Sequence, residues 1–164
     1  MLGGLFIALF ILTFGVVFFG APYVPTRQKD VEKLFDLVDL SDGRLVDLGA
    51  GDGRLMLAAA KRQLNSTGWE LSPVIWAIAW FRLRSHRRYA DIRLGSFWRA
   101  KLPDDTTAAF TFLASRHMKQ LDGFLSREAK RLGHPIHLVS YGFQVPGRTI
   151  EKQDGALIVY RFEP

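Results

Sequence analysis

The stretch RLVDLGAGDGR, residues 44–54, decides the fold that the sequence predicts. Apolar Leu45, Val46 and Leu48 predict a short buried strand, and three alternate glycines follow at once. The next segment, LMLAAAKR (55–62), is rich in strong helix formers. A strand, a glycine turn and a helix together build a nucleotide-binding corner, because glycines let a ligand approach the backbone and the helix N-terminus offers unpaired N–H groups.

The spacing of the glycines restricts the classes of ligand that could bind at this corner. A dinucleotide fingerprint, GxGxxG, would need glycine at position 54, which is Arg54. The chain instead has GxGxG at Gly49, Gly51 and Gly53, with Asp47 two residues before the first glycine. A tight turn that holds no ligand also fits this pattern. The pattern resembles motif I of the class I S-adenosylmethionine (SAM) methyltransferases.

A second acidic residue supports a ligand at this corner. The segment NSTGWELSP (65–73) predicts a turn, a short strand and then Glu70 at the end of the strand. The second strand of a βαβ unit ends beside the first, so a carboxylate there can accept hydrogen bonds from both hydroxyls of a ribose. A solvated loop carboxylate is the alternative for Glu70 alone.

A longer arrangement around this corner is similar to a smaller family. YVPT (23–26), an amphipathic helix over 27–40, LVDLGAGDGRL and the GWELSP strand resemble the small membrane-anchored protein-lysine methyltransferases, which include the mitochondrial enzymes acting on ATP synthase c-subunit and adenine nucleotide translocase. The resemblance implies an α/β, Rossmann-like class I methyltransferase sandwich with a mostly parallel sheet and an antiparallel C-terminal strand. It covers about residues 21–162.

The resemblance also implies which residues hold SAM. An acidic residue often follows the third strand (expected within 90–103) and bonds the adenine amino group, but this chain has Ser96 there, which accepts one hydrogen bond without charge. Asp47 and Asp52 are expected to position the methionine end. The full set of expected cofactor-binding residues is Asp47, Gly49, Ala50, Gly51, Asp52, Gly53, Glu70, Leu71, Ser96 and Phe97.

Aromatic side chains are the candidates for a channel that admits the methyl acceptor. An apolar channel lowers the pKa of a lysine ammonium, and aromatic walls favour its cationic head. The aromatic candidates are Tyr23, Trp98, Tyr141 and Phe143, with ordinary core packing as the alternative for each, and Thr26 is a further candidate for the channel. No general base is evident, although His117 follows the fourth predicted strand (107–115).

The N-terminal run LGGLFIALFILTFGVVFF (2–19) carries no charge. At about 1.5 Å per residue its length matches the hydrocarbon core of a bilayer. We expect an uncleaved, single-pass anchor over 1–20, with a cleaved signal peptide as the alternative. The first basic residues follow the run, so the positive-inside rule places the domain on the cytoplasmic or matrix side. Residues 21–43 then form a pre-methyltransferase segment and 44–164 the SAM-binding domain.

Composition limits the remaining classes of function. The 164 residues contain 22 Lys and Arg against 16 Asp and Glu, a net charge of +6. A basic run over 82–88 follows a predicted helix (74–84); an anionic lipid surface is its simplest partner, nucleic acid a less favoured one and a solvated face the alternative to both. The absence of cysteine excludes disulfides and thiol chemistry, and the four histidines show no metal-binding spacing.

The remaining pattern completes the sheet and leaves three functions open. A helix (116–132), a fifth strand (136–143) and a hairpin around Asp154-Gly155 are expected. The favoured function is SAM-dependent N-methylation of lysine in a protein, expected to be a membrane protein. The alternatives are methylation of a lipid, small molecule or RNA, and a non-catalytic interaction module with this fold. A nicotinamide or flavin binder is disfavoured by Arg54.

Overall fold

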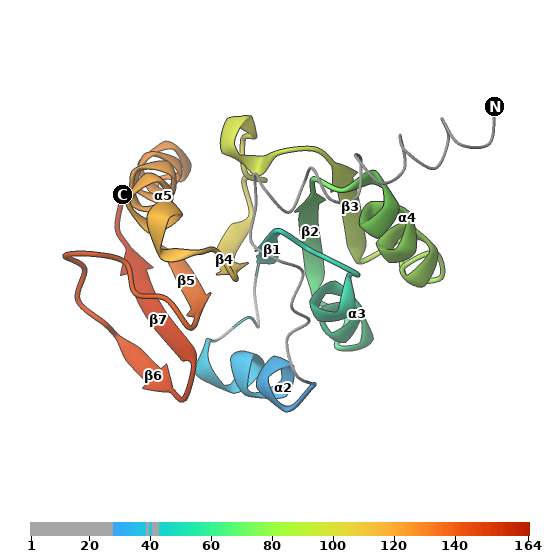
Figure 1. Cartoon of the computed structure of the whole chain (residues 1–164), viewed down its shortest axis with the longest axis horizontal. Helices are drawn as coiled ribbons and strands as arrows, with labels where there is room; N and C mark the ends of the chain where they lie inside the picture. The colour runs from blue at the N-terminus through green and yellow to red at the C-terminus, as the bar shows by residue number, and fades with distance from the viewer. Residues whose placement is uncertain (1–27, 39, 41–42) are drawn as a thin grey trace, which may run out of the picture.

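A seven-stranded sheet forms the centre of the computed structural model, which describes residues 28–38, 40 and 43–164. The strand order is β3-β2-β1-β4-β5-β7-β6 (Figure 1). The strands are β1 (Arg44–Leu48), β2 (Asn65–Glu70), β3 (Ala90–Leu94), β4 (Thr106–Thr111), β5 (Ile136–Tyr141), β6 (Lys152–Asp154) and β7 (Leu157–Phe162). Strands β1 to β5 are parallel, β7 is antiparallel to β5, and β6 is antiparallel to β7. This confirms the expected mostly parallel sheet with an antiparallel C-terminal strand.

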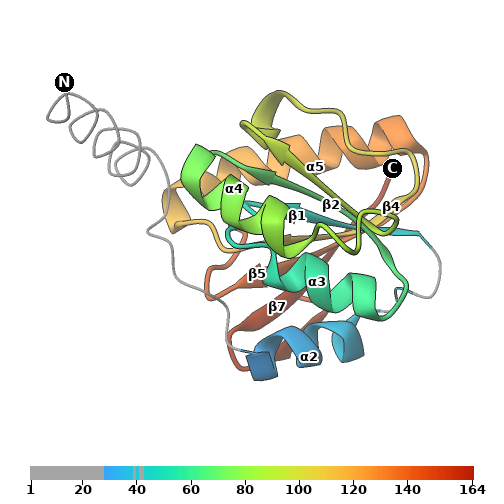
Figure 2. The same cartoon turned by 90° about the vertical axis from the view of Figure 1, so that its right-hand side faces the viewer.

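Helices cover both faces of the sheet. Figure 2 shows α2, α3 and α4 on one face and α5 on the other. The helices are α2 (Gln28–Leu37), α3 (Arg54–Lys61), α4 (Pro73–Arg82) and α5 (Met118–Leu132), with short 3-10 turns η1 (Phe97–Arg99) and η2 (Ser115–His117). The central strands β1, β2 and β4 are buried on both faces, and the buried polar residues within them include small ones such as Ser66 and Thr67 of β2.

Alternation along β1 divides the core between the two faces. Leu45 packs with α2 and α3, whereas Val46 and Leu48 pack with α5. Asp47, the buried polar residue of β1, lies among them. Since a strand side chain changes face at every residue, Asp47 shares the face of Leu45 and α3.

A glycine in β2 lets α3 approach the sheet closely. A Cβ at Gly68 would stand 2.5 Å from the sulfur of Met56 and 2.8 Å from the Cβ of Ala50. Any side chain there would push α3 away from β2 and displace the loop that begins α3. Gly68 therefore sets the spacing between the two segments that the sequence identifies as ligand-binding.

The element boundaries differ from the expected ones by a few residues. The fifth strand ends at Tyr141 rather than at residue 143, because Gly142 has a φ of 80° and turns the chain. In the C-terminal hairpin Asp154 pairs with Leu157, so the two-residue loop is Gly155-Ala156 rather than Asp154-Gly155. Gly155, with a φ of 59°, supplies the left-handed position of that turn.

The predicted anchor (1–20) and the YVPT segment, with Tyr23 and Thr26, lie outside the described residues. Among the residues that are described, no helix has the length and apolar character needed to cross a bilayer. The helix expected over 27–40 is α2. Val31 and Leu34 of this helix, and Val38 directly after it, are buried against the sheet.

Candidate functional site

The carboxyl ends of the five parallel strands meet at one edge of the sheet. The strand order reverses between β1 and β4, since β1 is followed in space by β2 on one side and by β4 on the other. At this point the Thr111 hydroxyl donates to the Leu48 carbonyl oxygen at 3.3 Å. Ligands of open α/β sheets bind outside the carboxyl ends of the strands at such a switch point.

The glycine loop between β1 and α3 forms the floor of this site. Gly49, Gly51 and Gly53 all have positive φ, at 113°, 55° and 76°. The N–H groups of Gly49 and Ala50 both donate to the Trp69 carbonyl oxygen, at 3.1 and 2.8 Å, which ties the loop to β2. A Cβ on Gly49 would meet nothing within 4 Å, so its open side leaves space for a ligand.

Glu70 holds this loop from the neighbouring strand. Its carboxylate accepts the backbone N–H of Gly51 at 3.0 Å and the backbone N–H of Ser72 at 2.7 Å. The side chain is buried. A carboxylate has about four acceptor positions, so two remain for a ligand's hydroxyls. Glu70, the residue that the sequence predicts at a ribose, thus also shapes the loop, and this positioning role was missed by sequence reasoning.

Asp47 carries an unused buried acceptor. Within the described part of the chain, its Oδ1 is the only buried side-chain oxygen or nitrogen without a hydrogen-bond partner. Burial, together with the nearby carboxylates of Glu70 and Asp52, raises the pKa of Asp47 to about 8. Three acidic groups around one loop form an environment that a cation would stabilise.

Asp52 has the opposite environment. Its carboxylate is paired with the guanidinium groups of Arg54, at 2.9 Å, and of Arg82. Arg82 also donates to the Asp52 backbone carbonyl oxygen at 2.9 Å, so α4 fixes the loop. Burial alone would raise the pKa of Asp52, but the hydrogen bonds from the two arginines outweigh it and lower the pKa to about 2. Asp52 is therefore a charged fixture of the loop at neutral pH.

The remaining predicted cofactor residues lie around the same edge. The Gly95 N–H donates to the Glu70 carbonyl oxygen at 2.8 Å, which places exposed Ser96 one residue from the end of β2. Leu71 follows Glu70 and is exposed. Phe97, in contrast, is buried in the core against Phe124, with ring centroids 5.8 Å apart.

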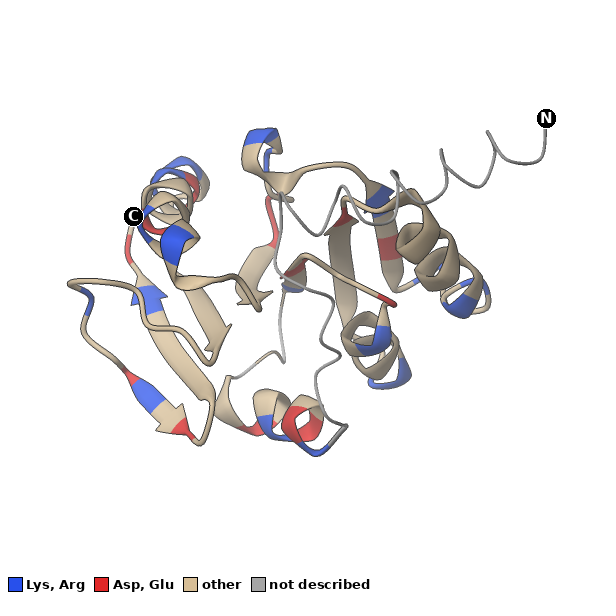
Figure 3. Cartoon of the chain, viewed as in Figure 1, with Lys and Arg blue, Asp and Glu red and all other residues tan. Residues whose placement is uncertain are grey.

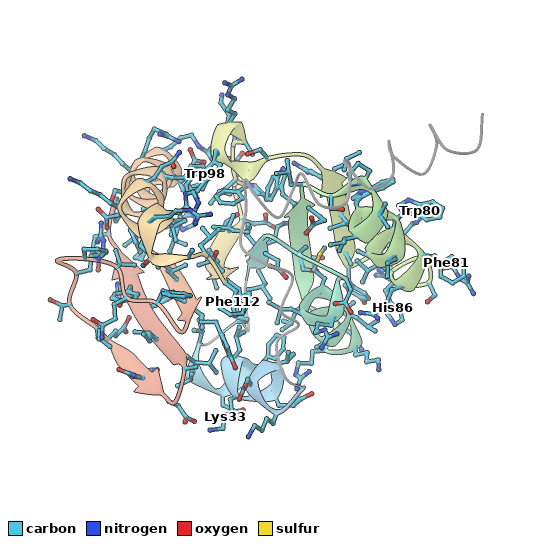
Figure 4. The ribbon with its side chains drawn as sticks, viewed as in Figure 1. Lys33, Trp80, Phe81, His86, Trp98 and Phe112 are labelled. Carbon is cyan, nitrogen blue, oxygen red and sulfur yellow. The ribbon has the colours of Figure 1, made fainter. Side chains whose placement is uncertain are left out.

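The aromatic candidates separate into two groups at this edge. The first group is formed by Trp98, Phe97 and His117. The ring centroid of Trp98 lies 4.3 Å from that of Phe97 and 6.3 Å from that of His117, and the second contact connects the loop after β3 to the loop after β4. Figure 4 shows Trp98 on the α5 side of the sheet and Phe112 nearer its centre. Within this first group, the Nε2 of His117 accepts a hydrogen bond from the Nε of Arg116 at 3.0 Å.

The second group is built around Phe112, which sequence reasoning missed. Its ring lies 5.0 Å from that of Tyr141, edge to face, and 6.3 Å from that of Phe143. The Tyr141 hydroxyl donates to the Asp30 carboxylate at 2.8 Å, which joins α2 to β5. Phe112 directly follows the strand segment TAAFT, and no signal in the sequence separates it from a core residue.

These features accommodate a ligand with one cationic end and one end rich in hydroxyls. The unpartnered Asp47 oxygen suits the cation, Glu70 suits the hydroxyls, and the open side of Gly49 leaves room between them. SAM has this pattern, with an ammonium and a sulfonium at one end and a ribose at the other. In the described residues no three metal-binding side chains gather into a cluster.

Sequence comparison identifies known proteins that are similar to this chain. The family model of the ANTKMT methyltransferase domain matches residues 47–152. A human lysine N-methyltransferase of the ATP synthase c-subunit is 32% identical over 111 residues, which are 65% of this chain and 46% of the relative. A protein-lysine N-methyltransferase of Saccharolobus islandicus is 29% identical over 82% of this chain and 86% of its own length. The chain thus matches about half of the human relative and most of the Saccharolobus one.

Solved structures share the fold. An RNA methyltransferase from Salinibacter ruber, in complex with S-adenosyl-L-homocysteine, superposes with a TM-score of 0.74 at 23% identity, over 85% of this chain and 92% of that one. At this identity the likeness concerns the fold alone. It confirms that the sheet and helices described above are those of a class I methyltransferase.

Proposed function

The chain belongs to the ANTKMT methyltransferase domain family, and from this membership and the geometry we propose that it transfers a methyl group from SAM to a lysine side chain of a protein. The observation that carries the proposal is the buried, unpartnered oxygen of Asp47 beside the loop that Glu70 holds. Relatives named as protein-lysine N-methyltransferases support lysine as the acceptor.

The cofactor side of the site is assigned to three acidic residues. Bound SAM supplies an electrophilic methyl group on a sulfonium. Asp47 would bind the cationic methionine end of SAM through its unpartnered Oδ1. The positive charge of SAM would in turn stabilise the ionised form of the Asp47 carboxylate. Glu70 binds the ribose hydroxyls, and Asp52 keeps the loop in shape through Arg54 and Arg82. The neutral hydroxyl of Ser96 would accept a hydrogen bond that the adenine amino group donates.

The acceptor side is assigned to the aromatic group after β4 and β5. Phe112, Tyr141 and Phe143 form an apolar wall at the strand exits. The Tyr141 ring is fixed in place because its hydroxyl donates a hydrogen bond to the Asp30 carboxylate. Burial against such a wall lowers the pKa of a lysine ammonium, which must lose a proton before its nitrogen attacks. The ring faces also attract the cation as it enters. Positioning, with reacting atoms about 3–3.5 Å apart, then supplies most of the catalysis.

The acceptor protein and the membrane are further parts of this proposal. The apolar run 2–19 supports a single-pass anchor that holds the domain on the cytoplasmic or matrix side, near a membrane-protein substrate. The full chain would then stay with membranes during alkaline carbonate extraction. Its release into the supernatant would contradict the anchor but not the methyl transfer.

Binding and transfer are tested on the full chain in mild detergent. Titration calorimetry should detect SAM binding that Asp47→Asn abolishes and that Asp154→Asn, at an exposed carboxylate on β6, leaves unchanged. Incubation with tritiated-methyl SAM and membrane extracts should then label protein, and mass spectrometry should place the methyl group on lysine. Label found only in lipid or RNA would overturn the lysine assignment, and no SAM binding by the folded protein would overturn the function as a whole.

A further inference from the structure

Helix α4 exposes apolar side chains along its outer face. Val74, Ile78 and Phe81 recur at helical spacing and are 38%, 50% and 60% exposed, and Trp80 beside them is 43% exposed. Figure 4 shows Trp80 and Phe81 at the outer margin of the molecule, turned away from the sheet. An apolar stripe on an outer helix marks an interaction site, because soluble surfaces seldom gather large apolar side chains. We call these four residues, together with Leu94 of the neighbouring β3, the α4 surface.

Arginines border this surface and point their charge over its rings. The Arg84 guanidinium lies 4.0 Å from the centre of the Phe81 ring, and that of Arg87 lies 4.2 Å from the centre of the Trp80 ring. Neither arginine has an acidic partner among the described residues. The segment 71–89 contains no Asp or Glu, and Figure 3 shows blue at the end of α4. The charge of the border is therefore uncompensated.

This combination fits an anionic bilayer surface. At a membrane interface the aromatic rings sit at headgroup level, aliphatic side chains enter the acyl region, and arginines meet anionic headgroups. A nucleic acid would satisfy the arginines but would leave Val74, Ile78 and Leu94 facing phosphate or water. Charge and apolar character thus favour lipid over RNA or DNA.

The α4 surface adjoins the site at both ends. Leu94 pairs with Glu70 across the sheet, and Arg82, in the last turn of α4, is paired with Asp52. We infer that the α4 surface docks on anionic phospholipid, with Ile78, Trp80 and Phe81 at the interface and Arg84 and Arg87 on headgroups. Docking sets the cofactor loop beside the bilayer. The inference does not depend on SAM binding or on lysine as the acceptor.

Docking is tested on the full chain with a fluorophore that reports its surroundings. Because the chain has no cysteine, Ile78→Cys gives a single label site. Lys130→Cys, on α5 at the opposite face of the sheet, gives the control site. Each variant is labelled with a nitrobenzoxadiazole dye and mixed with vesicles of phosphatidylcholine, or of equal parts phosphatidylcholine and phosphatidylserine. An N-terminal hydrophobic anchor would attach the chain to both kinds of vesicle. Docking of the α4 surface, in contrast, requires the anionic lipid, so a difference between the two kinds of vesicle reports docking and not attachment through the anchor.

We expect the dye at position 78 to shift to the blue with phosphatidylserine vesicles, and the shift to decline with added salt. The dye at position 130 should not shift. Replacing both Arg84 and Arg87 by Gln should weaken docking about twenty-five-fold, at about fivefold for each arginine. Arg127→Gln, which removes an arginine that also lies over a ring but on α5, should leave docking unchanged.

Three results would overturn the inference. One is no blue shift at position 78 with phosphatidylserine vesicles. Another is a dye already blue-shifted without lipid and insensitive to it, which would mean that part of the chain covers the α4 surface. The third is a shift produced by total yeast RNA and not by the vesicles. SAM titration of the same labelled proteins reports the proposed function separately.

Discussion

The carboxylate of Glu70, at the end of β2, accepts the backbone N–H of Gly51, in the loop after β1, at 3.0 Å. This bond crosses between the two segments that the sequence marks as ligand-binding. One side chain therefore fixes the glycine loop and also keeps acceptor positions at the edge where we propose that SAM binds. Loss of its charge should affect ligand binding more than folding.

Glu70→Gln should weaken SAM binding by about tenfold to a hundredfold. The amide keeps the shape of the side chain but replaces charge-assisted hydrogen bonds, each contributing about 1.5–3 kcal/mol, with weaker ones. One amide N–H would also face a backbone donor, from Gly51 or Ser72. Titration calorimetry measures the change.

Glu128→Gln provides the matched control for Glu70→Gln. Glu128 is also a buried carboxylate that accepts a backbone N–H, that of Leu102 at 2.9 Å, but it lies on α5 and pairs with Arg131. The control should lower thermal stability and leave SAM affinity unchanged. Equal losses of affinity in both variants would show that Glu70 acts only through folding.

The raised pKa of Asp47 predicts a pH dependence of stability in the absence of ligand. The pKa of this carboxyl in the unfolded chain is about 3.9, and burial raises it to about 8 in the folded one. Between these values the folded state binds more protons than the unfolded state, so stability falls as pH rises from about 4 to about 8. The slope from this one group is at most about 1.4 kcal/mol per pH unit.

Asp47→Asn should remove that slope, because the amide does not titrate. Urea unfolding at several pH values measures it, with the parent chain and Asp47→Asn compared. The depressed pKa of Asp52 acts in another window, since its stabilisation is lost only as pH falls from about 4 towards 2. A slope between pH 5 and 8 that persists unchanged in Asp47→Asn would assign the effect to other groups.

The sequence was sufficient for the fold and for the acidic and glycine residues of the loop, and for physical reasons. The GxGxG turn, the strand before it and Glu70 are local patterns, and right-handed βαβ geometry then brings β1 and β2 side by side. The bond from Gly51 to Glu70, the unpartnered oxygen of Asp47 and the Arg82–Asp52 pair depend on tertiary packing and leave no local pattern.

Phe112 illustrates the same limit on the acceptor side. In the sequence it extends an apolar strand and is indistinguishable from a core residue. Its contact with Tyr141 arises only because β4 and β5 are neighbours that end at the same edge. Trp98, which the sequence predicts in a channel, packs on Phe97 and Phe124, as a core residue does, and its channel role stays a prediction.

Ser96→Asp should tighten SAM binding about fivefold. Ser96 lies one residue beyond the Gly95 N–H that bonds to Glu70, where a carboxylate could accept the adenine amino group. A charge-assisted hydrogen bond exceeds a neutral one by roughly 1 kcal/mol. Thr149→Asp, at an exposed loop position, adds the same charge elsewhere and should not change affinity. Unchanged or weaker binding by Ser96→Asp would place the adenine away from this residue.

Phe112→Leu should lower kcat/KM for a lysine-containing acceptor about tenfold and leave SAM affinity unchanged. The substitution keeps apolar volume but removes the ring face, whose attraction for a desolvated cation is worth about 1–2 kcal/mol. Tyr141→Phe is the contrasting variant: it keeps the ring and removes the hydroxyl that donates to Asp30, so it should cost about 1 kcal/mol of stability with little loss of kcat/KM. Phe35→Leu, a half-buried ring on α2 that lies under Arg62, controls for the loss of a ring elsewhere. If Phe112→Leu and Phe35→Leu change kcat/KM equally, the aromatic group after β4 and β5 does not line the acceptor channel.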